Sequence, residues 1–428
     1  MKLLVLSNGH GEDSIATSII EQLSLIADKL EIQALPIVGT GYAYSKLGIP
    51  IIGEVRQMPS GGFIYMRGRP LWEDLNDGLI SLTLQQIKTV RQWGKHNSVI
   101  LAVGDIVPLS FAWLSGCNYA FVGTAKSDYY WRNSQGEWLS QTSWWERRLG
   151  SVYLPWERYL LSCQRNIAVF PRDTLTTDIL KRSGIRAYDL GNPMMDGFSL
   201  SNNQKPIPHV QGNLSPSPLS ILLLPGSRMP EALRNWQQII EATSEVIKEF
   251  PSRELLFLSA IAPSLNSKAF QEELLTQGWQ LIASDQFSIE EYNNDQVFLR
   301  KQYATLCLTQ NSYGACLQQA DIAIAMAGTA TEQFVGLGKP AIIMPGNGPQ
   351  CTFAFVEAQT RLLGCSVTLV TNPQEVGKAI ASLLNDPKKL QEIAHNGKIR
   401  MGTAGAAKRI ALKIKETLLD GSELIKNT

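Results

Sequence analysis

Short, continuously apolar runs alternate along this chain with segments whose apolar residues recur at helical spacing. Residues 3–6, 99–103 and 221–224 are runs of this kind, and each is followed by a loop and then by a helical pattern. A continuous apolar run is typical of a strand that is buried on both faces of a parallel sheet. The alternation therefore predicts an α/β protein with parallel sheets.

The same pattern places further strands and helices throughout the chain. We predict additional strands at residues 31–35, 120–123, 167–170, 187–190, 255–258, 280–283, 322–326 and 341–344. We predict helices at about residues 14–25, 74–94, 174–182, 267–277, 353–363, 373–384, 388–397 and 404–419, and a further helix that carries Trp236 and Ile240 on one face. These elements form two βαβ sets of similar size.

A segment with little apolar periodicity separates the two sets. Residues 200–220 carry Asn, Gln, Ser and four prolines, which is typical of a linker. We therefore predict an N-terminal domain at residues 1–199, a linker at 200–220 and a C-terminal domain at 221–400. The helix at about residues 404–419 is long enough to pack back on the first domain, and closure about the linker would exclude water from the site.

Composition excludes several classes of protein. Of the 428 residues, 44% are apolar and 18% are charged, which fits a globular protein of two or three domains. The formal net charge of +1 gives no overall field that would attract nucleic acid. The six cysteines are scattered without a CxxC pair, which indicates reduced thiols, and no apolar window reaches the ~18 residues of a membrane span. We expect a cytoplasmic protein that is soluble or peripheral on the inner face of a membrane.

The predicted loop after the first strand carries candidate chemistry. Residues 7–14 include Asn8, Gly9, Gly11 and Glu12, and they open a β-loop-α unit, where doubly wound sheets bind ligands. The match to a dinucleotide-binding pattern is weak, and no acidic residue ends the second strand. The sequence therefore does not predict an NAD site.

Asp105 follows the strand predicted at residues 99–103. The carboxyl end of a parallel strand is the edge at which α/β sheets carry chemistry, so Asp105 is a candidate catalytic carboxylate. An aspartate at this position can instead cap the next helix, and taken alone this is the stronger interpretation. Both interpretations stay open.

Two loops in the second half have the chemistry of a diphosphate site. Gly328 lies in a turn of small residues at 327–330, and Glu332 falls in the first turn of the helix expected from about Thr331, where its carboxylate could accept hydrogen bonds from a ribose diol. Free N–H groups at the start of a helix favour a phosphate. An ordinary strand-to-helix turn is the alternative interpretation.

The other loop contains Gly226, Ser227 and Arg228 at the start of a predicted helix. The arginine could bind a phosphate through two hydrogen bonds. Because no DxD motif ends a strand, we predict no metal at this site, and the helix dipole and Arg228 must offset the diphosphate charge.

Aromatic and basic residues are concentrated in one segment of the first half. Half of the ten tryptophans lie between Trp131 and Trp156, mixed with tyrosines and arginines up to Tyr159. Amphipathic aromatic rings suit a bilayer interface, but they also suit a protein contact or a sugar platform. Peripheral membrane contact through residues 131–159 is one of these three alternatives.

Several pieces of sequence, taken in order, resemble a known family. They are residues 223–228 with Glu231, residues 328–332, residues 103–105 and residues 191–196. Together they resemble the GT-B glycosyltransferases, most closely lipid-A-disaccharide synthase and more distantly the peptidoglycan and diacylglycerol glycosyltransferases. The similarity extends from about Leu3 to about Leu384. It implies a GT-B fold, in which two Rossmann-like domains with parallel sheets face each other across a cleft.

The resemblance also implies an activity. It is the transfer of a sugar from a UDP-sugar to a lipid or lipid-linked acceptor at the membrane surface, with inversion and without a metal or other cofactor. The donor-binding residues it implies are Gly226, Ser227, Arg228, Glu231, Gly328, Thr329, Thr331 and Glu332, and the acceptor-side loop is Asn8, Gly9, Gly11 and Glu12.

Two residues are candidates for the base that removes the proton of the acceptor hydroxyl. The resemblance favours Asp105, whereas His10 is favoured by chemistry because histidine titrates near neutrality. The two could act together, or Asp105 could act alone. The first loop is closer to the histidine-bearing glycine loops of lipid glycosyltransferases than to that of lipid-A-disaccharide synthase, and the aromatic segment at about residues 129–145 is additional.

Two other functions fit the same architecture. A UDP-sugar 2-epimerase needs no acceptor, and an aromatic and basic surface would be of no use to a small soluble substrate. A nucleotide-sugar or lipid binder without activity would need neither His10 nor Asp105. Epimerisation without acceptor would indicate the first, and UDP binding without turnover would indicate the second.

Overall fold

The computed structural model describes residues 1–27, 30–55, 79–94, 98–198, 218–282, 295–346, 348 and 351–420. The chain divides into two compact units. The first unit comprises Met1–Asp196 and Thr403–Thr428, and the second comprises Gly197–Gly402. Most of the predicted linker, residues 200–217, lies outside the described residues, and residues 219–220 already belong to the first strand of the second unit.

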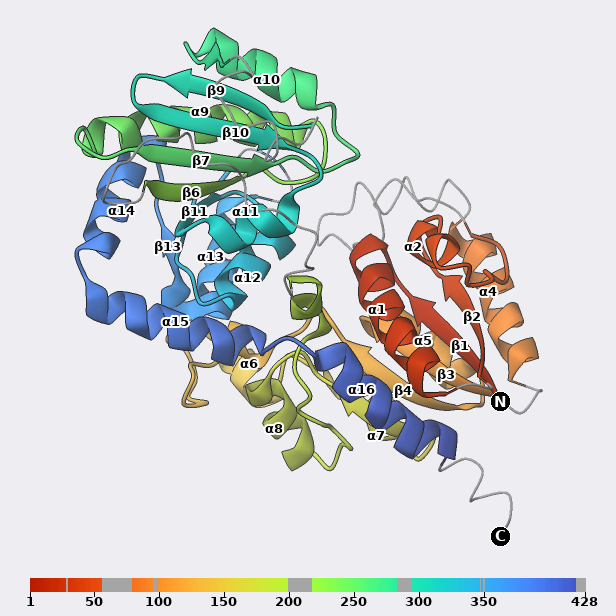
Figure 1. Cartoon of the computed structure of the whole chain (residues 1–428). Coiled ribbons are helices and arrows are strands. Elements are labelled where there is room, and N and C mark those ends of the chain that lie inside the picture. The colour runs from red at the N-terminus through yellow and green to blue at the C-terminus, as the bar shows by residue number, and fades with distance from the viewer. Residues whose placement is uncertain are drawn as a thin grey trace. The chain divides into compact units, whose positions relative to one another are not determined.

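The first unit contains a sheet of five parallel strands. In spatial order they are β2 (Glu31–Pro36), β1 (Lys2–Ser7), β3 (Ser98–Gly104), β4 (Asn118–Gly123) and β5 (Asn166–Phe170) (Figure 1). The first strand of the chain thus lies inside the sheet, with β2 on one side and β3 on the other. The connections leave β1 and β3 in different directions, so the carboxyl ends of these two strands form a topological switch point.

Helices cover both faces of this sheet. The described helices are α1 (His10–Ile26), α2 (Tyr42–Lys46), α4 (Leu79–Trp93), α5 (Ile106–Leu114), α6 (Trp144–Leu149), α7 (Pro155–Ser162), α8 (Thr174–Arg182) and α16 (Ala406–Ile414). Leu3 and Val5 of β1 pack with residues of α1 and α16, whereas Leu4 and Leu6 pack with residues of α4 and α5. This burial on two faces explains why the strand is continuously apolar.

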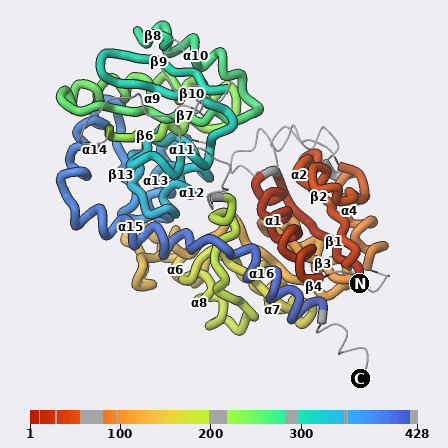
Figure 2. The backbone as a smooth tube through the Cα atoms, in the orientation of Figure 1, coloured from red at the N-terminus to blue at the C-terminus, as the bar shows by residue number. Residues whose placement is uncertain are grey.

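The C-terminal helix α16 belongs to the first unit and lies beside α1 (Figures 1 and 2). One carboxylate fixes its start: Asp196 accepts hydrogen bonds from the backbone N–H groups of Gly405 (2.7 Å), Ala406 (2.9 Å) and Ala407 (2.5 Å). These are orphan donors of the first helical turn, and a negative charge there also complements the helix dipole. The motif at residues 191–196 therefore anchors the returning C-terminal helix.

The second unit contains a sheet of eight strands. In spatial order they are β13 (Val367–Leu369), β12 (Ala341–Ile343), β11 (Ile322–Ala325), β6 (Leu219–Leu224), β7 (Leu255–Ala260), β10 (Ala304–Thr309), β9 (Val297–Lys301) and β8 (Gln280–Leu281). The first six are parallel, and β9 runs antiparallel to both of its neighbours, β10 and β8. Because β6 begins the unit and lies between β7 and β11, its switch point is at the carboxyl ends of β6 and β11.

The described helices of this unit are α9 (Glu231–Glu249), α10 (Ser267–Thr276), α11 (Tyr313–Gln319), α12 (Thr329–Gly336), α13 (Phe353–Leu363), α14 (Val376–Leu384) and α15 (Pro387–Met401). On α9, Trp236, Ile239 and Ile240 are buried. The predicted α/β class, with two Rossmann-like sheets, is confirmed.

Two local predictions are wrong. The segment at residues 10–14 is not a loop, because α1 already begins at His10: Gly9 adopts φ 128° before it, and Glu12 and Asp13 supply negative charge to the first helical turn. Residues 187–190 form a single bridge, Val169 to Ala187, since the carbonyl of Leu190 accepts a hydrogen bond from Arg409 instead. The helix expected at about 404–419 is present, as α16 followed by a π-helical turn, Lys415–Asp420.

Candidate functional site

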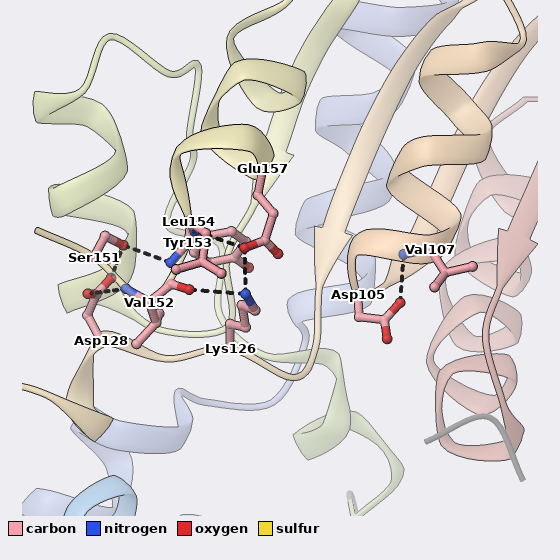
Figure 3. Close-up of polar contacts among 9 residues, drawn as sticks. All are labelled: Asp105, Val107, Lys126, Asp128, Ser151, Val152, Tyr153, Leu154 and Glu157. Atoms are coloured by element: carbon pink, nitrogen blue, oxygen red, sulfur yellow. Dashed lines mark hydrogen bonds and ion pairs between the residues drawn. The ribbon is translucent and has the colours of Figure 1, made fainter. Parts of the chain in front are cut away.

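Asn8 and Asp105 meet at the switch point of the first unit. Asn8 follows β1 and Asp105 follows β3, and the side-chain amide of Asn8 donates to both carboxylate oxygens of Asp105 at 3.2 Å. The backbone N–H of Val107 donates to Oδ1 of the same carboxylate at 2.9 Å (Figure 3). Asp105 is therefore the N-cap of α5 and also part of a polar cluster. The capping role is observed, and its catalytic role remains a prediction.

Gly104 lets these groups come close together. Its φ of +136° is in the region that favours glycine, and a Cβ added there would lie 3.3 Å from Cγ of Glu12 and 3.7 Å from Cβ of Asn8. A larger residue would push against Glu12. The last residue of β3 thus makes room for a second carboxyl group beside Asp105.

Glu12 is half-buried in the first turn of α1, and its Oε1 accepts a hydrogen bond from the hydroxyl of Thr124 at 3.4 Å. Burial raises the pKa of the Glu12 carboxyl to about 7, and the charges of Asp105 and Asp13 raise it further, whereas hydrogen bonds from the backbone and from Thr124 oppose the shift. Near neutral pH, Glu12 can therefore hold or release a proton.

Burial also raises the pKa of the Asp105 carboxyl above its usual value, although the hydrogen bonds from Val107 and Asn8 lower it. The charge of Glu157 adds to the increase. The two neighbouring carboxyls differ in their donors: Asp105 receives an amide and a backbone N–H, which favour its charged form.

The remaining residues of the predicted acceptor-side loop lie at the start of α1. Gly9 is the residue before the helix, and Gly11 is exposed, with no atom within 4 Å of an added Cβ. His10 is the first residue of α1, but its side chain lies outside what the structure describes. The role predicted for His10 remains a prediction.

A basic residue that the sequence analysis missed lies on the neighbouring strand end. Lys126 follows β4, and its Nζ donates to Oε2 of the buried Glu157 at 2.5 Å and to the carbonyl of Val152 at 3.1 Å (Figure 3). The ammonium group also lies 5.8 Å from the ring centre of Tyr153. Its place three residues beyond a buried strand was the available signal in the sequence.

Asp128 forms a separate buried polar group nearby (Figure 3). Its carboxylate accepts hydrogen bonds from the hydroxyl of Ser151 at 2.9 Å and from the N–H of Val152 at 3.2 Å. Burial raises the pKa of Asp128 to about 7. These contacts hold the segment that leads into α7, so we assign Asp128 a structural role.

The two predicted diphosphate loops lie side by side at the switch point of the second unit. Gly226 follows β6 with φ +99°, and a Cβ there would lie 3.6 Å from the carbonyl oxygen of Met326, which follows β11. Ser227 and Arg228 are exposed, and Gly328 is half-buried beside them in the same set of strand ends. The structure thus brings together residues that are about 100 positions apart in the sequence.

The predicted donor-binding residues differ in exposure. Thr331 is fully buried, and its hydroxyl donates to the carbonyl of Ala327 at 2.6 Å, so it shapes the turn from within. Glu231 is also buried, and its carboxyl group packs against Gly348. Thr329 is exposed and Glu332 is half-buried in the first turn of α12, which begins at Thr329 rather than at Thr331. Direct ligand contact by Thr331 would therefore require rearrangement.

The aromatic segment exposes large side chains on α6 and α7, which together are called the surface on α6 and α7 below. Its large exposed side chains are Trp144 (77% exposed), Trp145 (50%), Trp156 (60%) and Tyr159 (67%). Arg147 and Arg148 on α6 are exposed too, whereas Tyr129 and Tyr153 are buried and belong to the core. Among the described residues, no helix is both long enough and apolar enough to span a bilayer.

No protein-family model matches the sequence, and no curated protein matches it. Several solved structures are similar. MurG of Acinetobacter baumannii is 12% identical, with a TM-score of 0.54, over 97% of this chain and 99% of that chain. The UDP-GlcNAc 2-epimerase of Neisseria meningitidis, solved with bound UDP-GlcNAc, is 14% identical, with a TM-score of 0.54, over 98% of this chain and 100% of that chain.

A third similar structure is MnaA of S. aureus with UDP, which is 13% identical, with a TM-score of 0.54, over 97% of this chain and 96% of that chain. At these identities the likeness establishes the fold. The predicted fold class is confirmed: the chain has a GT-B fold, with one Rossmann-like sheet in each unit.

Proposed function

We propose that the protein is a glycosyltransferase that moves a sugar from a UDP-sugar to a lipid or lipid-linked acceptor. The observation that carries the proposal is the position of the candidate residues at both switch points. The Asn8 and Asp105 pair lies at the ends of β1 and β3, and the Gly226 and Gly328 loops lie at the ends of β6 and β11. Open α/β sheets bind their ligands at this edge.

In this proposal the second unit binds the nucleotide. The N–H groups at the starts of α9 and α12 face the diphosphate, Arg228 offsets its charge, and Glu332 accepts hydrogen bonds from the ribose. The similar structures of N. meningitidis and S. aureus were solved with UDP-GlcNAc and with UDP, which supports a UDP-linked donor. No metal is required, because the helix termini and the arginine stabilise the leaving UDP.

The first unit supplies the base. Asp105 accepts the proton of the acceptor hydroxyl while the oxygen of that hydroxyl forms a bond to the anomeric carbon of the sugar. At the same time the bond from the anomeric carbon to the phosphate oxygen of UDP breaks, and UDP leaves with the electron pair. Asn8 orients the carboxylate through its two hydrogen bonds. Glu12, as a neighbouring carboxyl with a pKa of about 7, can take the proton on from Asp105. His10 is the other candidate base.

The surface on α6 and α7 supports a lipid acceptor. Exposed tryptophans beside exposed arginines suit the interface of an anionic bilayer, where rings insert among the head groups and guanidinium groups meet phosphates. We therefore propose peripheral contact with the cytoplasmic face of a membrane through Trp144, Trp145, Trp156 and Arg148. We further propose that the glycolipid chemistry resembles that of lipid-A-disaccharide synthase.

A UDP-sugar 2-epimerase is a second candidate, since the similar N. meningitidis structure is such an epimerase. It would use the same nucleotide site, but its substrate would be released without meeting an acceptor. The exposed aromatic surface favours the transferase.

Transfer is tested with radiolabelled UDP-sugars, a membrane lipid extract and EDTA. We expect label in the lipid fraction and release of UDP, and we expect Asp105→Asn to lower the turnover by ~10²–10⁴, because it removes the base while keeping the size of the side chain. Asp189→Asn, at an exposed position of the same unit, should leave turnover unchanged. Full activity of Asp105→Asn would refute the assigned base, and a 2-epimer formed without lipid would establish the epimerase.

Membrane contact is tested by sedimentation with vesicles of phosphatidylglycerol or phosphatidylcholine. We expect binding to the anionic vesicles that weakens at high salt, and a loss of about tenfold for Trp156→Ser, because burying a large apolar side chain contributes ~1.5–3 kcal/mol. Tyr42→Ser is the matched control, since Tyr42 is 66% exposed on α2 of the same unit. Equal partitioning of wild type and Trp156→Ser, or no binding to either vesicle, would contradict a membrane role for this surface.

Because the pKa of Glu12 is raised in the folded protein, the free energy of unfolding should fall as the pH rises. Below pH 4.5 Glu12 is protonated in both states, but between 4.5 and about 7 the unfolded chain loses this proton while the folded protein retains it. The free energy of unfolding therefore falls over that range. We expect Glu12→Gln to be more stable than wild type above pH 7, by about 1–2 kcal/mol once solvent screening of a half-buried group is allowed for, and equal to it below pH 4.5.

Denaturant unfolding of both proteins at the two pH values measures this difference. Glu21→Gln, at an exposed position on the same helix, should show no such pH-dependent gain. A gain that is the same at both pH values would mean that Glu12 does not retain its proton in the folded protein.

A further inference from the structure

One buried side chain contacts both diphosphate loops of the second unit. Asn235 lies on α9 and is 2% exposed. Its amide nitrogen donates to the carbonyl of Pro225, after β6, at 3.0 Å and to the carbonyl of Met326, after β11, at 3.3 Å. Because both acceptors are carbonyl oxygens, the NH₂ end of the side chain must face them. The two loops are therefore joined through one carboxamide.

The other end of this side chain lies against a third loop. The Oδ1 atom of Asn235 is buried, and among the described residues it has no hydrogen-bond partner. A Cβ added to Gly346, which follows β12, would lie 2.6 Å from this oxygen and 3.0 Å from Cε of Met326. Only a glycine allows such an approach, so the loops after β6, β11 and β12 all meet at Asn235.

These contacts orient the peptide groups of the two diphosphate loops. In a trans peptide the C=O and the following N–H point in opposite directions. When Asn235 draws the carbonyls of Pro225 and Met326 inward, the N–H groups of Gly226 and Ala327 must point away from it. The carbonyl of Ala327 is likewise held inward, by the hydroxyl of Thr331 at 2.6 Å and the amide of Gln359 at 3.1 Å. This turns the N–H of Gly328 outward.

The three outward N–H groups are available to bind an anion. Within the described part of the chain, no residue accepts a hydrogen bond from the N–H of Gly226, Ala327 or Gly328. Convergent backbone N–H groups of adjacent loops form a concave site for a phosphate group. Their alignment depends on carbonyls that side chains behind the loops hold in place.

We propose that Asn235 is a positioning residue for the diphosphate of the donor: it fixes the Gly226 and Ala327 loops so that their N–H groups bind one diphosphate together. It does not touch the ligand itself. The inference rests on the proposed nucleotide site, and it adds a residue that determines how tightly the diphosphate, as distinct from the nucleoside, is held.

The test compares UDP with uridine. Calorimetry measures the affinity for UDP, and saturation-transfer NMR measures that for uridine, in wild type, Asn235→Leu and Asn396→Leu. Asn396→Leu is the matched control, because the amide of Asn396 also bridges two acceptors in this unit, the carbonyl of Leu363 at 2.7 Å and the hydroxyl of Ser366 at 2.8 Å, away from the strand ends.

We expect Asn235→Leu to weaken UDP binding about tenfold or more and to leave uridine binding within about twofold, because only the diphosphate contacts are misaligned. Asn396→Leu should lower the melting temperature and change neither affinity. If Asn235→Leu does not fold, Asn235→Ser, which leaves room for a bridging water, decides by the same comparison. Equal losses for UDP and uridine, or no loss for UDP, would overturn the inference. A wild type that binds uridine and not UDP would instead refute the proposed donor site, and the inference with it.

Discussion

In each unit the first strand along the chain lies in the interior of the sheet, and the positions of the candidate site residues follow from this topology. Strands β1 and β6 each start a unit, and their later neighbours were added on opposite sides. Because parallel crossovers are right-handed, the connections to the two sides run over opposite faces, and the loops after β1 and β3, or after β6 and β11, separate. Room for a ligand arises there without any loss of core packing. Asn8 and Asp105 lie at the first of these places, and Gly226 and Gly328 lie at the second.

Both switch points join their diverging loops with a carboxamide. In the first unit Asn8 donates to Asp105 across β1 and β3, and in the second Asn235 donates to Pro225 and Met326 across β6 and β11. The first amide thereby stabilises a carboxylate beside a carboxyl whose pKa is about 7, and the second turns peptide N–H groups outward. In the proposed function, the first edge moves a proton and the second holds the diphosphate. A sugar transferase needs both.

The sequence predicts the parts whose signal is local. Continuous apolar runs placed β1, β3 and β6, and small residues after strands placed the Gly226 and Gly328 loops. Asn235 was missed because its role requires two loops that are about 100 residues apart to lie together, and a helix pattern records only its burial. The early start of α1 was missed because His10 and Gly11 are poor helix formers, and the acidic first turn that stabilises them was assigned to a loop. Strands β9 and β10 were also missed; β9 lies between β10 and the two-residue edge strand β8, and its side chains are only partly buried.

The most direct test of the account is calorimetric titration of UDP, with EDTA present, into wild type, Glu332→Ala and Glu392→Ala. Glu332 is half-buried in the first turn of α12 at the predicted donor site, whereas Glu392 is an exposed glutamate on α15 of the same unit. We expect metal-independent binding by wild type and by Glu392→Ala, and a clear loss of affinity in Glu332→Ala. No binding of UDP by the folded wild type, or equal binding by all three proteins, would contradict a nucleotide site at the ends of β6 and β11.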